Sequence, residues 1–306
     1  MRRFLALVRS AALQALAEPL SAILILIALL TVHLAPVFHY HQFGEAGRLA
    51  RECGFSALLV FGLTFATAAA VRAVGGELAS GTAAAALARA VPRPLFFCAK
   101  VVGVACAFFL YWVGVAAALI LAAYSSEIGA QLMRLEGVSH VWGPGVVTGV
   151  GGTTLGFVLA AVANRFWRAR FCVSACLLMA LSQPVALALS VLLKVPVECQ
   201  PTWGVLPAHL LLALGCCVFI ALAGALSVYF KPAPVTACVG AAVALSFLWP
   251  IRFLLPDLAC FWLVDQLAAG GTVPALILLR GFGAGICLLA IWLTIGSVLM
   301  MRREIP

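Results

Sequence analysis

Few residues of this 306-residue chain stand at spacings that catalysis or metal binding would use. Three histidines, His33, His39 and His41, lie at the end of the first long apolar run, where imidazoles could hold a metal such as copper. No cysteine and no fixed pair of acids accompanies them. We therefore interpret them as polar residues at a membrane interface, with metal handling as the alternative, and expect no metal site.

The motifs of hydrolases and nucleotide-binding proteins do not occur. The sequence contains neither H-E-x-x-H nor G-x-S-x-G, and its ten Asp and Glu residues are too sparse for paired acid–base chemistry. It also lacks a G-x-x-x-x-G-K-[ST] phosphate loop; Gly152 and Gly156 lie in an apolar run, where their spacing favours close helix packing. We expect no catalytic centre and no cofactor, so the chain is predicted not to be an enzyme.

The eleven cysteines do not form a recognisable framework either. Most lie within or at the ends of apolar runs, where a free cysteine behaves as a small hydrophobic residue. Cys216 and Cys217 are adjacent, without the C-x-x-C spacing of a metal or redox site. Neither a metal nor a disulfide framework is expected.

The elements that carry these residues are predicted to be membrane-spanning helices. The chain is 65% hydrophobic and only 9% charged, with a mean hydropathy of +1.17. A soluble domain of this size would need far more charge on its surface. We predict an all-α, polytopic membrane bundle that forms one domain over residues 1–306, with no soluble domain. Eight spans are expected, at about 20–38, 54–74, 96–124, 143–163, 173–193, 205–230, 234–255 and 274–301.

The charge pattern predicts the orientation of these spans. Thirteen of the nineteen Lys and Arg residues, those at both termini included, fall in the loops assigned to one side, whereas seven of the ten acids fall on the other. Because cytoplasmic loops are enriched in basic residues, we place both termini in the cytoplasm and the chain in the cytoplasmic (inner) membrane. The same distribution explains the net charge of +9 without a nucleic-acid partner. Before the first span, the segment from the N-terminus is predicted to form a basic amphipathic helix on the cytoplasmic membrane face, ending at Glu18-Pro19.

A polar segment between the second and third spans is the most informative part of the chain. From Gly76 to Gly103 it combines a Ser80-Gly81-Thr82 start, an alanine run and a stop at Pro92 and Pro94. Ser80 or Thr82 could cap the helix, and Arg89 near its end complements the dipole. We predict a short cytoplasmic helix over residues 77–93; on spacing alone it could be an ordinary interfacial helix.

This segment resembles the coupling region of type-2 ABC exporter permeases. That family shows an acidic residue, Gly-Thr, a helix, an arginine, and then Lys and Gly at set offsets; here Glu77, Gly81, Thr82, Arg93, Lys100 and Gly103 match. The prolines around Arg93, and Ala79 in place of a second acid, depart from the pattern. Weaker similarity from Phe43 to the second span, and from Leu255 to Arg303, extends it to about two-thirds of the chain. The family has six spans, so residues 141–194 would be an added helical hairpin.

The resemblance implies a permease subunit of an ATP-driven export system. A separate ABC ATPase subunit would grip the coupling helix, and a second permease chain, the same or different, would complete the path through the lipid membrane. The coupling surface would be formed by Glu77, Gly81, Thr82, Arg89, Arg93 and Lys100. The alternatives are an ATPase-independent transporter or channel and, less favoured, a membrane enzyme or assembly factor. Gln183, which precedes Pro184 in the fifth span, is the candidate pathway residue.

Overall fold

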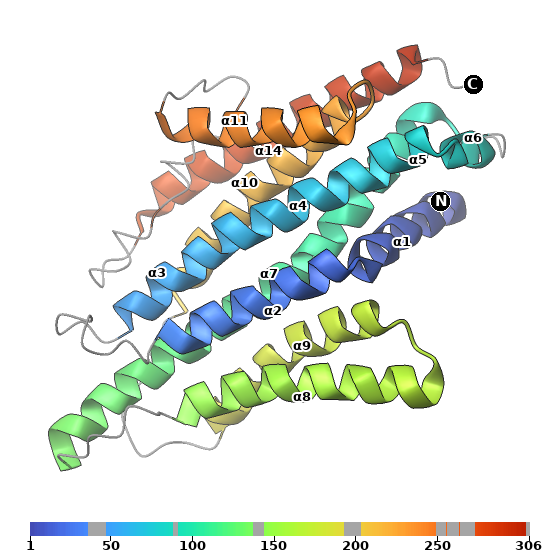
Figure 1. The fold of residues 1–306 in the computed structure, drawn as a ribbon. Helices are drawn as coiled ribbons and strands as arrows, with labels where there is room; N and C mark the ends of the chain where they lie inside the picture. Colours follow the sequence, from blue (N-terminus) through green and yellow to red (C-terminus); the bar gives the residue numbers. More distant parts are fainter. Residues whose placement is uncertain are drawn as a thin grey trace.

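A computed structural model describes residues 1–35, 47–87, 91–136, 144–192, 203–248, 255, 263 and 273–303. Within these ranges the regular structure is entirely helical (Figure 1). The elements are α1 (Arg2–Ala17), α2 (Pro19–Leu34), α3 (Arg48–Ala57), η3 (Leu58–Gly62), α4 (Leu63–Ala70), η4 (Val71–Gly76), α5 (Glu77–Ala79), α6 (Thr82–Leu87), α7 (Arg93–Glu136), α8 (Pro144–Trp167), α9 (Phe171–Leu192), α10 (Val205–Leu226), α11 (Pro232–Leu248) and α14 (Ala275–Arg302). The predicted helical class is confirmed.

Helices occur at all eight predicted positions, but not all meet the length of a span. Among the described residues, six helices are long and apolar enough to cross a membrane, and the bent pair α1–α2 raises the number to seven. The seventh predicted span corresponds to α11, which is shorter, with 17 residues. At 1.5 Å per residue it covers about 26 Å, somewhat less than a hydrocarbon core of about 30 Å. A helical membrane bundle is therefore supported, and eight spans stays a prediction.

The chain bends where proline ends the first helix. Between α1 and α2 the direction changes by 67°, at Glu18-Pro19, as predicted. Proline is well suited to the first position of α2 because the amide that it lacks has no helical partner there.

The second span is one nearly continuous helix from Arg48 to Ala79 that includes two π-helical segments, η3 and η4. Such wider turns are uncommon and frequently occur near functional sites. Beside η3, the buried hydroxyl of Tyr111 donates to the carbonyl of Ala57 at 2.8 Å. The Tyr111 ring stacks on Phe65 and Phe108 with centroids 5.8 Å apart in each case.

Helix α7 is the central element of the bundle. It contacts α1, α2, α3, α9, α10 and α14, and many of its side chains are buried. By contrast, α8 and α14 expose most of their surface, including apolar side chains such as Leu155 and Leu279. These exposed apolar faces fit contact with lipid rather than water.

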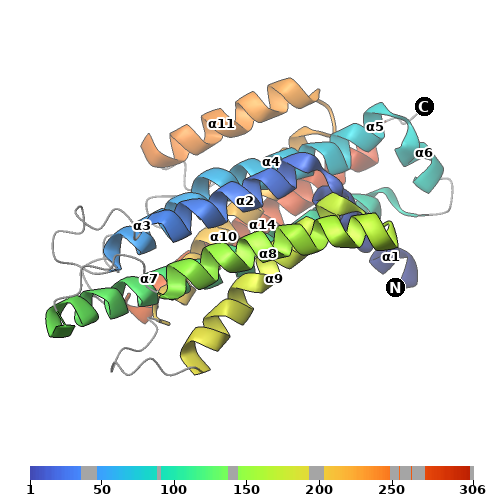
Figure 2. The ribbon, with the colours of Figure 1, turned by 60° about the horizontal axis from the view of Figure 1, so that its bottom comes forward.

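Helices α8 and α9 form a hairpin, as predicted for 141–194 (Figures 1 and 2). A Cβ atom on Gly156 would lie 2.9 Å from the backbone of Leu178, so only glycine permits this approach. The G-x-x-x-G interpretation is confirmed at Gly156, whereas at Gly152 a Cβ would lie 3.5 Å from Ser182 Oγ, an ordinary contact that does not require glycine.

Candidate functional site

The predicted coupling segment lies at one end of the bundle. There α5, α6, the start of α7 and the end of α14 come together with both ends of the described chain (Figures 1 and 2). The cytoplasmic assignment of this end stays a prediction.

A buried ion pair connects two of the predicted site residues. Lys100 Nζ donates to Glu77 Oε1 at 2.5 Å, and it lies 5.5 Å from the centre of the Phe96 ring. The lysine side chain is only 2% exposed and the glutamate 17%. Two charges withdrawn from water in this way depend on each other, because either one alone would be left uncompensated. The pair fixes α5 to the first turns of α7.

Arg93 belongs to α7 rather than to the preceding helix. Its guanidinium donates to the carbonyl of Met301 at 3.2 Å and to that of Arg303 at 2.8 Å. These carbonyls lie at the C-terminal end of α14, where a cation is favoured by the helix dipole. Arg93 therefore ties the third span to the last one.

The predicted single helix over 77–93 is replaced by two short helices with a break. Helix α5 continues the second span, and α6 starts only at Thr82 and is described to Leu87. Gly81, with a φ of +73°, reverses the chain between them. A left-handed conformation of this kind is costly for a residue with a side chain, which explains the break within an otherwise helical pattern. Arg89, the remaining predicted residue, lies outside the described residues.

The expected N-cap is also different. Because α6 begins at Thr82, the cap position falls on Gly81, whose carbonyl accepts from the amide of Ala84 at 3.1 Å. The hydroxyls of Ser80 and Thr82 instead lie 2.9 Å apart, and each lies within 3.4 Å of the carbonyl oxygen of Glu77. One hydroxyl donates to the other, which in turn donates to this carbonyl. All three turn residues are exposed, so this turn forms the accessible part of the site; in α6, Ala83 is buried and Ala84 and Leu87 are half-buried.

An ion pair that the sequence did not single out also joins the site. Arg72, in η4, donates to the carboxylate of Glu18 at the α1–α2 bend. The only sequence signal for this pair is that both charges fall on the side assigned to the cytoplasm. Gly103, in the resemblance motif, allows α7 to approach α1, since a Cβ there would lie 2.5 Å from the carbonyl of Val8.

Gln183 occupies a separate polar cluster inside the bundle. It is fully buried; its Oε1 accepts from His33 Nε2 at 2.6 Å, and its amide nitrogen donates to Thr153 Oγ1 at 3.0 Å. The cluster joins α2, α8 and α9. His33 is thus a buried residue rather than the interfacial one that we predicted, because the hairpin covers it. His39 and His41 lie outside the described residues, and within the described part of the chain no group of three metal-ligating side chains occurs.

The comparisons with known proteins leave the family open. No family model, no curated protein and no solved structure matches the chain. The resemblance to type-2 ABC exporter permeases therefore rests on the motif residues alone.

Proposed function

We propose that the chain is the membrane-spanning permease subunit of an ATP-driven ABC export system. The turn at residues 80–82 and helix α6 would be the surface that a separate ATPase subunit grips. A second permease chain, the same or different, would complete the transporter in the cytoplasmic membrane as a homo- or heterodimer. ATP would be hydrolysed by the partner subunit and not by this chain.

The observation that carries this proposal is that polar contacts connect the accessible turn to several spans, the Glu77–Lys100 pair being buried and the Arg72–Glu18 pair largely exposed. Glu77 pairs with Lys100 of α7, Arg72 pairs with Glu18 at the α1–α2 bend, and Arg93 bonds to the end of α14. A force applied to α5 and α6 would therefore act on the first, second, third and last spans together. An ordinary interfacial helix has no need of such connections.

The connections also suggest how ATP binding would be transmitted. We call the turn at residues 80–82, with α5 and α6, the elbow. Closure of a pair of ATPase subunits would displace the elbows of both permease chains, and the ion pairs would pass that displacement to the spans. Rigid elements joined at a few polar contacts can move between discrete arrangements, as alternating access requires.

The test is co-purification of the tagged chain from membranes, followed by partner identification and an ATPase assay. Thr82→Glu changes the exposed helix start and is expected to weaken association with the ATPase subunit at least about tenfold. The reason is that the new carboxylate would be buried against that subunit without a partner of opposite charge. Arg165→Gln, at the exposed end of α8, changes the net charge by the same amount and should leave association intact. An ATPase whose binding is the same for both variants would refute the coupling surface.

An ATPase-independent transporter or channel is the alternative, and the buried cluster of His33, Gln183 and Thr153 is the observation that favours it. Polar groups inside a membrane bundle often mark a transport path. Flux through vesicles that contain only this chain, without nucleotide, would support that function.

A further inference from the structure

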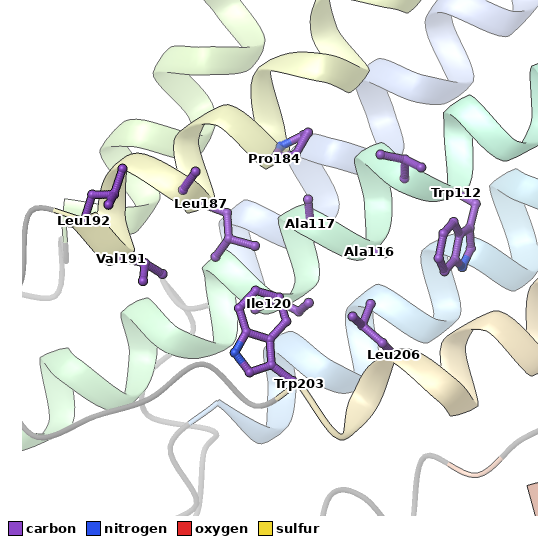
Figure 3. A pocket seen from close by; sticks show the side chains of 12 residues that line it. Trp112, Ala116, Ala117, Ile120, Pro184, Leu187, Val191, Leu192, Trp203 and Leu206 are labelled. Carbon is purple, nitrogen blue, oxygen red and sulfur yellow. The ribbon is translucent and has the colours of Figure 1, made fainter.

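We propose that a cavity between α7, α9 and α10 holds one acyl chain of a bilayer phospholipid. The cavity has a volume of about 530 Å³, which falls within the range of about 300–1,000 Å³ typical of ligand sites. Figure 3 shows Trp112 and Trp203 on the α7 and α10 sides, with Pro184 and Leu187 of α9 facing them. This inference does not depend on the proposed transport function.

The cavity results from the way α7 and α9 cross. At Gly114 the two helices touch, because a Cβ there would lie 3.0 Å from the Cα of Ala180. Beyond this point Pro184 interrupts the regular bonding of α9, and proline within a helix favours a bend. Towards its C-terminal end α9 diverges from α7 (Figure 2), and Leu206 of α10, with Trp203 just before this helix, lines the third side of the space.

The chemistry of the wall selects a hydrocarbon. All twelve residues that line the cavity are apolar or tryptophan, and the indole N–H of Trp112 already donates to the carbonyl of His209 at 3.3 Å. A polar ligand would lose its hydrogen bonds to water here and find almost no replacement. An acyl chain loses nothing, since it exchanges one apolar surrounding for another.

The position and length of the cavity favour an acyl chain of a bilayer lipid over a transmembrane helix of a second copy. Its wall runs from Trp112 to Ile120 on α7 and from Pro184 to Leu192 on α9, which is about 12 Å along either helix. One leaflet contributes about half of a 30 Å hydrocarbon core, so this length suits a single acyl chain. A span from a second copy would need a groove across the full core.

The mouth of the cavity belongs to the lipid-facing surface. Leu192, which is 75% exposed, lines the cavity and also lies at the end of the exposed face of α9 formed with Val185 and Leu189. Trp203 is 51% exposed where the chain enters α10, and tryptophan favours the headgroup level of a membrane. On α7 the cavity lies between Lys100 and Glu127, in the half nearer Glu127 and remote from the elbow. An acyl chain could therefore enter sideways from the leaflet on that side.

The experiment uses the full chain in nanodiscs that contain phosphatidylcholine with a diazirine at the end of one acyl chain. After irradiation, we expect labelled peptides to concentrate on residues 112–120 and 184–192, and native mass spectrometry to find one retained phospholipid per chain. Ala117→Phe fills the cavity from α7, and Ala188→Phe narrows it from α9. Each variant should reduce this labelling several-fold and lose the retained lipid.

Val185→Phe is the matched control, because it adds a ring to the same helix outside the cavity wall. The lipid diazirine should label residues 112–120 and 184–192 of this variant as strongly as those of the unsubstituted protein. Labelling spread evenly over the exposed faces of α8, α9 and α14, unchanged in a folded Ala117→Phe or Ala188→Phe variant, would mean annular lipid only and would overturn the proposal. Chemical cross-links between the cavity residues and a second copy of the protein in the same nanodiscs would also overturn the proposal.

Discussion

At the scale of single residues, the ion pair of Glu77 and Lys100 has the clearest energetic consequence. Lys100 is almost completely enclosed, so its charge is tolerated only because the carboxylate lies against it. Removing one partner of a buried pair costs about 3–5 kcal/mol, whereas removing both is often close to neutral. We therefore expect Lys100→Met and Glu77→Gln each to lower the unfolding temperature of the purified protein clearly, and the double variant to recover most of the loss.

Thermal unfolding of the three variants in one detergent measures this coupling. Arg48 and Glu52 provide the control, since their ion pair is substantially exposed, and pairs of that kind contribute little. Equal losses for Lys100→Met and Arg48→Met, or strictly additive losses in the double variant, would show that Glu77 and Lys100 do not depend on each other.

At the scale of elements, the hairpin of α8 and α9 depends on close backbone contact. Gly156→Ala places a methyl group 2.9 Å from the backbone of Leu178, so the helices must move apart. A loss of about 1–3 kcal/mol is typical of such overpacking. At Gly151 on the same helix a methyl group meets nothing within 4 Å, and Ala is the better helix former. We expect Gly156→Ala to lower the unfolding temperature and Gly151→Ala to keep or raise it; the opposite order would contradict the contact.

The separation of α8 and α9 by Gly156→Ala should also affect the buried polar cluster of His33, Gln183 and Thr153. Gln183 bridges α9 to His33 on α2 and to Thr153 on α8. A hairpin displaced by Gly156→Ala would weaken these bonds as well, so its effect can exceed that of the methyl group alone.

At the scale of the whole molecule, the two ends of the bundle differ in charge. The elbow end contains the basic residues of both termini and of the α8–α9 turn, whereas the other end has the balanced pairs of Arg48 with Glu52 and Arg51 with Glu127. The positive end is expected in the cytoplasm. We predict that alkaline phosphatase fused after Pro306 stays inactive, and that the same enzyme fused after Leu192 is active.

Green fluorescent protein at the same two positions is the complementary reporter, because it should fluoresce only at the cytoplasmic site. An active phosphatase after Pro306 would place the C-terminus outside. It would also reduce the number of crossings to an odd one, in agreement with the short length of α11.

Much of the fold follows from the sequence because the determining signals are local. Apolar runs long enough to cross a membrane, and a proline at residue 19, predict where the helices lie and where the first one bends. Glycines four residues apart predict the close approach of α8 and α9. The break at Gly81 within residues 77–93 was not predicted, because Ser80-Gly81-Thr82 is typical of the start of one helix and a glycine in the sequence does not by itself show that it adopts a positive φ.

By itself, then, the sequence determined a helical membrane protein and a polar elbow between two of its spans. Only the tertiary structure decided which charges meet, which polar side chains are enclosed and where a cavity remains. Glu18 and Arg72 lie 54 residues apart, and His33 and Gln183 lie 150 apart. Such pairs depend on how the helices cross, and a crossing is set by the side chains of several helices at once. A periodic pattern along one helix cannot specify it.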